Sequence, residues 1–339
     1  HEGITGFFPS PTVGGETAYR KVLRFFVRRL LISIPILFAV ATLTFFLVRA
    51  APGDPFADEK KIPEASRQEI VAFYGLDLPL WQQYVRFLGN LVRLDPGYSY
   101  SHPGYSVSEI IANHFPTTLA YAVPGFLLAL ALGIPLGSIA ALRHGRVGDW
   151  GASAFAMVGI CLPTFVIGPL LALFLGSYLG LFPSVGWITA ARFTNDFPAW
   201  SFVVLPALTL AILYSAFITR LSRSGLIETL RSDFIRTARA KGLSSQRILW
   251  RHALPVSLLP VINFLGPALA GMLTGSFVVE SIFNIPGLGQ FFVEAAIDRD
   301  YPLLLGLVVF YAALILALNL AVDLFQAALN PRIRETLGQ

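Results

Sequence analysis

Long uncharged runs divide the chain, and six of them have about the length that a helix needs to cross a bilayer. A helix rises about 1.5 Å per residue, so about 20 apolar residues span a hydrocarbon core of about 30 Å. Period-two alternation is absent, so each run is predicted to be a helix that satisfies its own backbone hydrogen bonds. The predicted spans are residues 30–48, 115–142, 152–179, 202–219, 260–279 and 302–322, the last continuing to about 329.

The composition agrees with a chain that is surrounded mostly by lipid. Of the 339 residues, 55% are hydrophobic and 13% are charged, whereas a typical soluble domain has about 25% charged residues. The mean hydropathy is +0.66. The single cysteine, Cys161, lies within an apolar run, and one thiol makes neither an intrachain disulfide nor a metal cluster. These features disfavour a soluble globular domain.

Basic residues are distributed unevenly among the loops, and this distribution predicts the orientation. Lysine and arginine concentrate on the cytoplasmic side of membrane proteins. They are abundant in residues 20–29, 143–150, 220–259 and 330–334, whereas residues 50–114 carry many acidic groups. We therefore expect both termini and the 220–259 loop to be cytoplasmic. No basic residue precedes Arg20, which favours a retained first span over a cleaved signal peptide.

The spans and loops predict five parts of the chain. The parts are a flexible tail (1–19), a cytoplasmic flank with the first span (20–49), an external helical subdomain (50–114), a core with spans two to six (115–330) and a cytoplasmic tail (331–339).

The external loop is too long for a simple connector. Residues 63–76 and 79–94 have the periodicity of amphipathic helices, and a further helix is expected to begin at Ser106 or Ser108. We expect this subdomain to lie on the membrane. It can serve as a structural lid or as a docking surface for an external partner, and the sequence fits both.

Residues 233–255, DFIRTARAKGLSSQRILWRHALP, form a compact basic segment within the 220–259 loop. A first helix is predicted to extend to about Lys241, because Gly242 can adopt the left-handed conformation that ends a helix. A second helix is predicted to end at about Ala253, before Pro255. The side chains that can cap the two helices are Ser232 or Asp233 for the first and Ser244 or Ser245 for the second.

The spacing of side chains in this segment predicts two faces. The apolar face holds Phe234, Ile235 and Ala238. Three interpretations are compatible with the residues: a solvated loop, an anchor for lipid headgroups, and a rigid element that inserts into a cytoplasmic protein. The capped helix–glycine–helix form favours the third. Nucleic-acid binding is disfavoured, because the flanking spans hold the segment at the bilayer surface.

The segment also resembles a known motif. RTARAKG followed by HALP is similar to the EAA loop of permease subunits of ATP-binding cassette (ABC) importers, in which Glu-Ala-Ala, Gly and Ile-x-Leu-Pro recur at fixed spacing. Four positions match: Ala238, Gly242, Leu254 and Pro255. Three depart: Arg236 replaces Glu, Thr237 replaces Ala and His252 replaces Ile, as is typical of the peptide and nickel branch.

Further motifs extend the resemblance over about residues 20–334. They are RAAPGDPF (49–56), LWQQY (80–84), VVESIFNIPGLGQFF (278–292), RDYP (299–302) and NPRIR (330–334). Together they resemble the first permease subunit of oligopeptide and dipeptide importers. The resemblance implies an all-α polytopic membrane protein with six transmembrane helices, the type I ABC importer fold, in a bacterial inner membrane.

The resemblance also implies a role for the basic segment, as the coupling helix that docks in a groove on a cytoplasmic ATPase. The residues that would make this contact are Asp233, Phe234, Arg236, Thr237, Ala238, Arg239, Lys241, Gly242, Leu243, Arg247, Leu254 and Pro255. The implied partners are a second homologous permease subunit, two ATPases that bind ATP and Mg, an external substrate-binding protein and membrane lipid. The implied cargo is an oligopeptide or dipeptide, with nickel or another small solute as the alternative.

Several signals for other functions are missing from the sequence. It contains no P-loop motif and no HExxH, so energy is expected to come from another polypeptide and no cofactor is expected in this chain. Glu280 and Asp323 are expected near the interfaces, where snorkelling lowers the cost of a charge. An ion-coupled secondary transporter is therefore a weaker alternative, since no proton relay is evident. A membrane enzyme would need a nucleophile or metal site, and His102, His114, His144 and His252 read as surface or interface residues.

Overall fold

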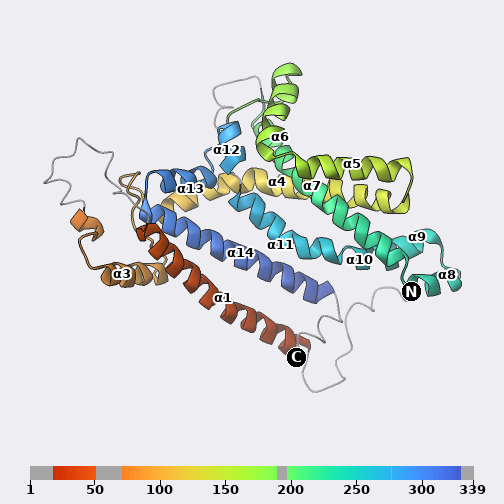
Figure 1. Cartoon of the computed structure of the whole chain (residues 1–339), viewed down its shortest axis with the longest axis horizontal. Coiled ribbons are helices and arrows are strands. Elements are labelled where there is room, and N and C mark those ends of the chain that lie inside the picture. Colours follow the sequence, from red (N-terminus) through yellow and green to blue (C-terminus); the bar gives the residue numbers. More distant parts are fainter. Residues whose placement is uncertain (1–17, 51–70, 189–196, 276, 330–339) are drawn as a thin grey trace.

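The computed structural model describes residues 18–50, 71–188, 197–275 and 277–329, and these form an elongated bundle of helices (Figure 1). Within the described residues, four helices are long and apolar enough to cross a membrane. They are α1 (Ala18–Ala50), α4 (Val107–Leu142), α7 (Ser201–Leu230) and α14 (Tyr301–Leu329). Two bent helix pairs bring the number of spans to six if each pair is counted as one. The predicted all-α polytopic fold is confirmed.

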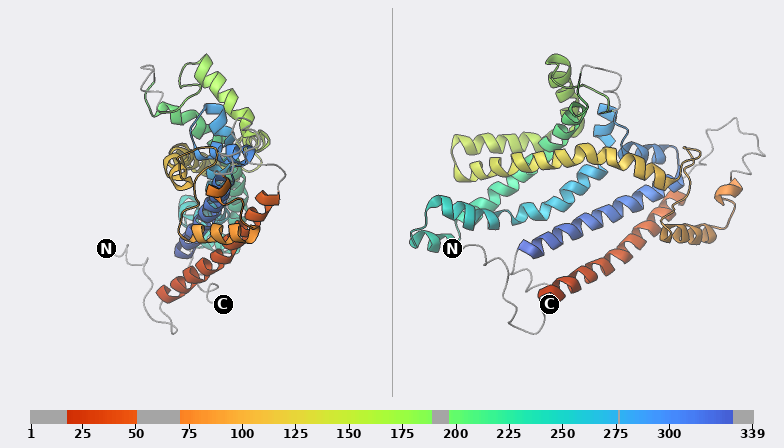
Figure 2. Two further views of the ribbon diagram at one scale, coloured as in Figure 1. Left: turned by 90° about the vertical axis from the view of Figure 1, so that its left-hand side faces the viewer. Right: turned by 180° about the vertical axis from the view of Figure 1, so that it is seen from behind.

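The remaining helices are shorter. They are α3 (Leu80–Val92), α5 (Val147–Cys161), α6 (Thr164–Leu171), the π-helical η2 (Ala172–Tyr178), α8 (Asp233–Ala240), α9 (Ser245–Ile248), the π-helical η4 (Leu249–Ala253), α10 (Leu254–Ser257), α11 (Leu259–Thr274), α12 (Phe277–Phe283) and α13 (Leu288–Ile297). Two views from opposite sides place α3 and α8 at opposite ends (Figures 1 and 2). We refer to these as the α3 end and the α8 end.

The centre of the bundle is the long parallel contact between α4 and α7. Glycines of α4 let the two backbones approach, because a Cβ at Gly125 would lie 2.8 Å from the Ala207 carbonyl oxygen and one at Gly133 would lie 2.7 Å from the Ile218 Cβ. Small residues at helix crossings are the usual means of close packing in lipid. Around this contact, α5 packs on α7, α11 packs on α14, and α1 packs on the outside of α14.

The third predicted span is wrong as a single helix. Residues 147–178 form α5 and then α6 with η2, and the two halves meet at an angle of 106°. The break falls at Leu162, which is extended with ψ 119°. The next residue is Pro163, whose ring disfavours the helical conformation for the residue before it.

The fifth predicted span, residues 260–279, is also interrupted. The helix α11 ends at Thr274, and α12 is a separate short helix. At its other end α11 meets α10 at a bend of 47° within residues 245–274. Pro260 occupies the first turn of α11 and has no N–H to donate to the preceding turn.

At the α3 end the sequence predictions hold in part. The helix expected in residues 79–94 is α3, and Ser106 caps α4 in a capping box with Glu109. The helix continues without a break into the second span, so α4 begins eight residues before the predicted start. Most of the helix expected in residues 63–76 lies outside the described residues, as do most of the tail 1–19 and all of the tail 331–339.

Of the two carboxylates expected to snorkel to an interface, Glu280 is instead enclosed by the protein, whereas Asp323 is partly exposed. Glu280 is fully buried and accepts hydrogen bonds from the Thr118 hydroxyl at 2.8 Å and the Tyr121 hydroxyl at 2.7 Å. Asp323 forms an ion pair with Arg29 of α1, with 3.2 Å between Oδ2 and the guanidinium nitrogen. Each charge is therefore compensated by neighbouring helices and not by water alone.

Candidate coupling site

The candidate site is an ordered helical element at the α8 end, formed by residues 233–253 and called here the α8–η4 element. The 220–259 loop expected from the sequence is mostly helical, because α7 continues for eleven residues past the predicted span and ends only at Leu230. A tight turn then leads to α8, and α9, η4 and α10 return the chain to α11. The element is thus held by a helix at each end.

Gly242 makes the turn within this element, as predicted. Its φ is +79°, and its N–H donates to the Arg239 carbonyl at 2.9 Å. Glycine adopts this conformation without the penalty that a Cβ brings. After the turn, the Ser244 hydroxyl accepts from the Arg247 N–H at 3.4 Å and caps α9.

The cap predicted for the first helix is only partly correct. Ser232 occupies the N-cap position of α8, but its hydroxyl donates to the Thr229 carbonyl at 2.6 Å and makes no capping hydrogen bond. The second helix also differs from prediction: it does not stop before Pro255 but continues through η4 into α10. Pro255 is accommodated there because it lies in the first turn of α10.

The apolar residues of α8 do not share one face. Ile235 and Ala238 are buried against the molecule, in a cluster with Leu226 of α7, Ala141 of α4 and Ile248 of α9. Phe234, by contrast, is 45% exposed and points away from that cluster. The inward residues therefore fix α8 to α7, which leaves Phe234 available to another molecule.

The residues predicted for the coupling contact divide into two groups. Ala238, Leu243 and Leu254 are buried or half-buried and hold the element together. The exposed group contains Asp233, Phe234, Arg236, Thr237, Arg239, Lys241, Gly242, Arg247 and Pro255. Asp233 and Arg236 form an exposed ion pair of 3.2 Å. This exposed group is therefore strongly basic, with Phe234 as its one large apolar side chain.

Among the residues of this element that were not predicted contacts, Ile235 and Trp250 are the most informative. Ile235 is the fully buried anchor of α8. Trp250 of η4 is 72% exposed, between the basic residues Arg247 and Arg251. Trp250 could have been identified from the sequence, because it is an isolated tryptophan in a charged segment and exposed aromatic rings are frequent anchors at protein interfaces.

An ion pair connects α7 to the first turn of α5. The Arg223 guanidinium of α7 binds both carboxylate oxygens of Asp149, with distances of 2.5 and 2.9 Å. The same carboxylate accepts from the Gly145 N–H at 2.9 Å and contacts the His144 ring at 3.1 Å. Asp149 is only 5% exposed. These contacts brace α7 close to the point where it leads into α8.

Comparisons with known proteins identify the family of the chain. The family model described as the binding-protein-dependent transport system inner membrane component matches residues 133–335, and the model of the N-terminal part of such components matches residues 22–122. The chain belongs to this family. The match to the permease family confirms the resemblance that the coupling segment and the dispersed motifs indicated.

Individual relatives cover nearly all of the chain. The oligopeptide transport system permease protein OppB of Haemophilus influenzae is 42% identical over 313 residues, which are 92% of this chain and 100% of that protein. The dipeptide transport system permease protein DppB of Bacillus subtilis is 38% identical over 311 residues, 92% of this chain and 98% of that protein. The chain is thus a multi-pass permease of an ABC transporter family.

A solved structure shares the fold. A chain of the MetNI methionine ABC transporter, in an inward-facing conformation, superposes with a TM-score of 0.50 and is 18% identical. The match covers 68% of this chain and 97% of that one. It supports the predicted ABC importer permease fold. Within the described residues, no group of three or more His, Cys, Asp or Glu side chains is placed to hold a metal ion.

Proposed function

We propose that this chain is one of two permease subunits of an ATP-driven importer that carries oligopeptides or dipeptides across the inner membrane. In this arrangement the α8 end is cytoplasmic, as are both termini, and the α3 end faces outwards to a substrate-binding protein. ATP and Mg are bound by two partner ATPases, and the permease contributes no catalytic site. The relatives OppB, AppB and DppB are named as oligopeptide or dipeptide permeases, which supports the peptide as cargo.

The observation that carries the proposal is the construction of the α8–η4 element. Ile235 and Ile248 are buried against α7, whereas Phe234 and Trp250 are exposed on a basic surface. A loop whose only role is to carry positive charge on the cytoplasmic side would need neither the buried Ile235 nor the turn at Gly242. It would also not need the ion pair that holds the adjoining α7 to α5. This element can transmit a displacement, because moving α8 as a body must also move α7.

The contact with an ATPase can be tested by crosslinking in the assembled transporter. The background is Cys161→Ser, which removes the single cysteine. Phe234→Cys and Trp250→Cys are expected to crosslink to an ATPase through a short bifunctional reagent. Val147→Cys, 86% exposed at the same end but outside the element, is the matched control. The assignment fails if all three positions crosslink equally or if none does.

Coupling can be tested by the paired substitutions Gly242→Pro and Gly180→Pro. Both glycines have positive φ, +79° and +61°, and both donate a backbone hydrogen bond, so proline disturbs the local turn similarly. Only Gly242 lies in the α8–η4 element. We expect Gly242→Pro to assemble but to lose at least about ten-fold in peptide uptake per ATP hydrolysed, with Gly180→Pro near normal. Normal coupling in Gly242→Pro would refute this role.

Uptake measurements also separate the alternatives for cargo and energy. Competition by di- to pentapeptides against a labelled peptide tests the cargo, with Ni²⁺ as the competing solute from the same family. Import that continues without ATPase subunits but stops with an uncoupler would identify a secondary transporter instead.

A further inference from the structure

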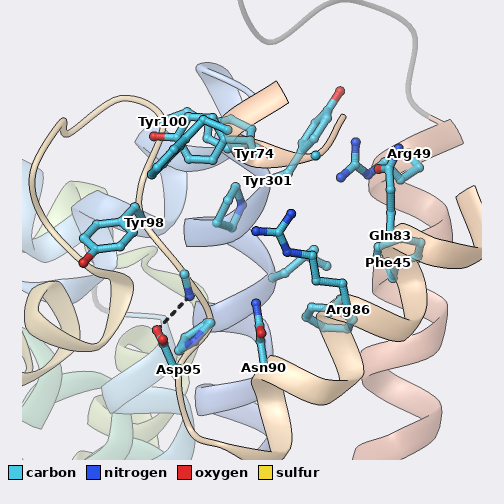
Figure 3. A pocket seen from close by; sticks show the side chains of 17 residues that line it. Phe45, Arg49, Tyr74, Gln83, Arg86, Asn90, Asp95, Tyr98, Tyr100 and Tyr301 are labelled. Carbon is cyan, nitrogen blue, oxygen red and sulfur yellow. Dashed lines mark hydrogen bonds between the residues drawn. The ribbon is translucent and has the colours of Figure 1, made fainter. Parts of the chain in front are cut away.

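A cavity of about 310 Å³ opens at the α3 end, between the end of α1, α3, the loop after α3 and the start of α14. Its volume is at the lower end of the range of small-molecule sites. One wall carries Tyr100 and Tyr301, and the other carries Phe45 and Phe87, whose rings stack at 5.5 Å. Figure 3 shows the Arg49 and Arg86 side chains approaching the same space from α1 and α3.

The loop wall of this cavity is fixed in place. Asp300 is fully buried and accepts backbone hydrogen bonds from Tyr100 at 2.9 Å and Ser101 at 3.0 Å, and a further one from the Ser99 hydroxyl. Burial, the largest cause, raises the pKa of Tyr100 well above its usual value, with the Arg49 charge opposing the shift. The phenol is therefore neutral at physiological pH. The contacts with Asp300 hold this loop against the start of α14.

The guanidinium groups of Arg49 and Arg86 make one side of the cavity positively charged. Arg49 lies over the Tyr301 ring at 4.8 Å and over the Phe45 ring at 5.6 Å, and its Nε–H is buried without an acceptor. Among the described residues, neither Arg49 nor Arg86 has a carboxylate within ion-pair distance. A buried charged donor without an acceptor is costly. The arrangement therefore calls for an anion that accepts hydrogen bonds.

One carboxylate belongs to the lining as well. Asp95 lies at the opposite edge of the cavity in Figure 3, where it accepts from the Gly97 N–H at 3.2 Å. With two arginines and one aspartate, the described lining has a net charge of +1. The cationic part is the side next to α1.

The position of the cavity indicates where the anion comes from. Its wall includes α1, the span with the smallest buried share, whose Leu43 and Leu47 are among many exposed apolar side chains. Arg49 is the first charged residue after the uncharged run 30–48, which places it at headgroup depth. The cavity lies away from the α4–α7 centre of the bundle. A lipid can therefore reach the cavity from the side, whereas a solute that passes along the centre of the bundle would not enter it.

We propose that this cavity binds the phosphate of a phospholipid headgroup, held by the Arg49 and Arg86 guanidinium groups between aromatic rings. Guanidinium groups bind phosphate oxygens bidentately, and tyrosine side chains suit the membrane interface. The site does not depend on the proposed transport function. In the proposed orientation the lipid belongs to the outer leaflet.

Native mass spectrometry of the full-length chain, delipidated in mild detergent, tests the proposal. Phosphatidylethanolamine is added back to the wild type, to Arg86→Gln and to Arg49→Lys, with diacylglycerol as a probe that has the same tails without phosphate. The matched control is Arg93→Gln, at the end of the same helix but outside the cavity. We expect one tightly bound phospholipid in the wild type and at least about ten-fold weaker retention in Arg86→Gln, because it loses charge-assisted hydrogen bonds. Arg49→Lys keeps the positive charge but lacks the planar guanidinium with its paired N–H donors, so a partial loss of lipid retention is expected.

Four results would overturn the proposal. Equal retention of diacylglycerol would show that the tails alone are bound, and equal loss in Arg93→Gln would show a general charge effect. If inorganic phosphate stabilised the chain against heat as strongly as the lipid does, the bound anion would be free phosphate from solution. Displacement of the lipid by a tripeptide would assign the cavity to the transport path. Arg86 is exposed, so its substitution is expected to leave the fold intact and the test remains decisive.

Discussion

The close contact between α4 and α7 predicts that the smallest possible enlargement of Gly133 destabilises the bundle. In Gly133→Ala the new Cβ would lie 2.7 Å from two Ile218 side-chain atoms and 2.9 Å from the Ser215 carbonyl oxygen. Carbon atoms pack best at about 3.5–4.0 Å, so the helices must separate by about 1 Å. Overpacking of this kind costs about 1–3 kcal/mol.

The control for this prediction is Gly151→Ala in α5, where no atom lies within 4 Å of the new Cβ. Both variants gain the same helix propensity, about 0.5–1 kcal/mol. The common gain cancels, so the two variants are expected to differ by about 1–3 kcal/mol, with Gly133→Ala the less stable.

Thermal unfolding in detergent, followed by loss of the monodisperse chromatographic peak, measures this difference. Gly133→Ala should unfold at a lower temperature than Gly151→Ala, by several degrees. If both variants shift the midpoint equally, the separation of α4 and α7 is not limited by this glycine, and the account of the central contact is wrong.

Three further predictions concern polar groups. In a double-mutant cycle, Asp149→Asn and Arg223→Gln should show a coupling energy of about 0.5–3 kcal/mol in thermal unfolding, and strictly additive losses would mean that the pair does not act as a unit. Ser106→Ala should cost about 1 kcal/mol and speed hydrogen exchange in the first turn of α4, whereas Ser108→Ala, whose hydroxyl bonds the Leu94 carbonyl, should leave that exchange unchanged. Glu280→Gln should raise proteolysis within residues 284–290 several-fold, because the carboxylate accepts the Gln290 N–H at 3.0 Å; unchanged cleavage would argue against this anchoring role.

The sequence predicted the four continuous spans and the turn at Gly242 because both depend on local properties. An uncharged run of sufficient length must be helical in lipid, whatever it packs against. Gly242 likewise needs no distant partner, since no atom lies within 4 Å of a Cβ placed there and its N–H bonds the nearby Arg239 carbonyl. The Ser106 cap belongs to the same class, because Glu109 completes it three residues away.

Other features depend on contacts between residues far apart in sequence. Hydropathy places Glu280 at the end of a run, but its burial follows from Thr118 and Tyr121, which lie about 160 residues away on α4. The break at Leu162 had a local signal in Pro163, but proline within a membrane helix is often tolerated, and Pro124 and Pro135 lie inside the continuous α4. Only packing decides between a kink and a break.

The faces of α8 show why the exposed half of the candidate site was harder to predict than its position. Periodicity groups Phe234 with Ile235 and Ala238, because adjacent helical positions are only about 100° apart. The cluster around Leu226 accommodates Ile235 and Ala238 and leaves Phe234 outside. A buried Ile235 and an exposed Phe234 on one short helix are what force transmission requires, since a helix with every apolar residue turned inwards would offer no anchor to a partner. A helix with all of them turned outwards would move without displacing α7.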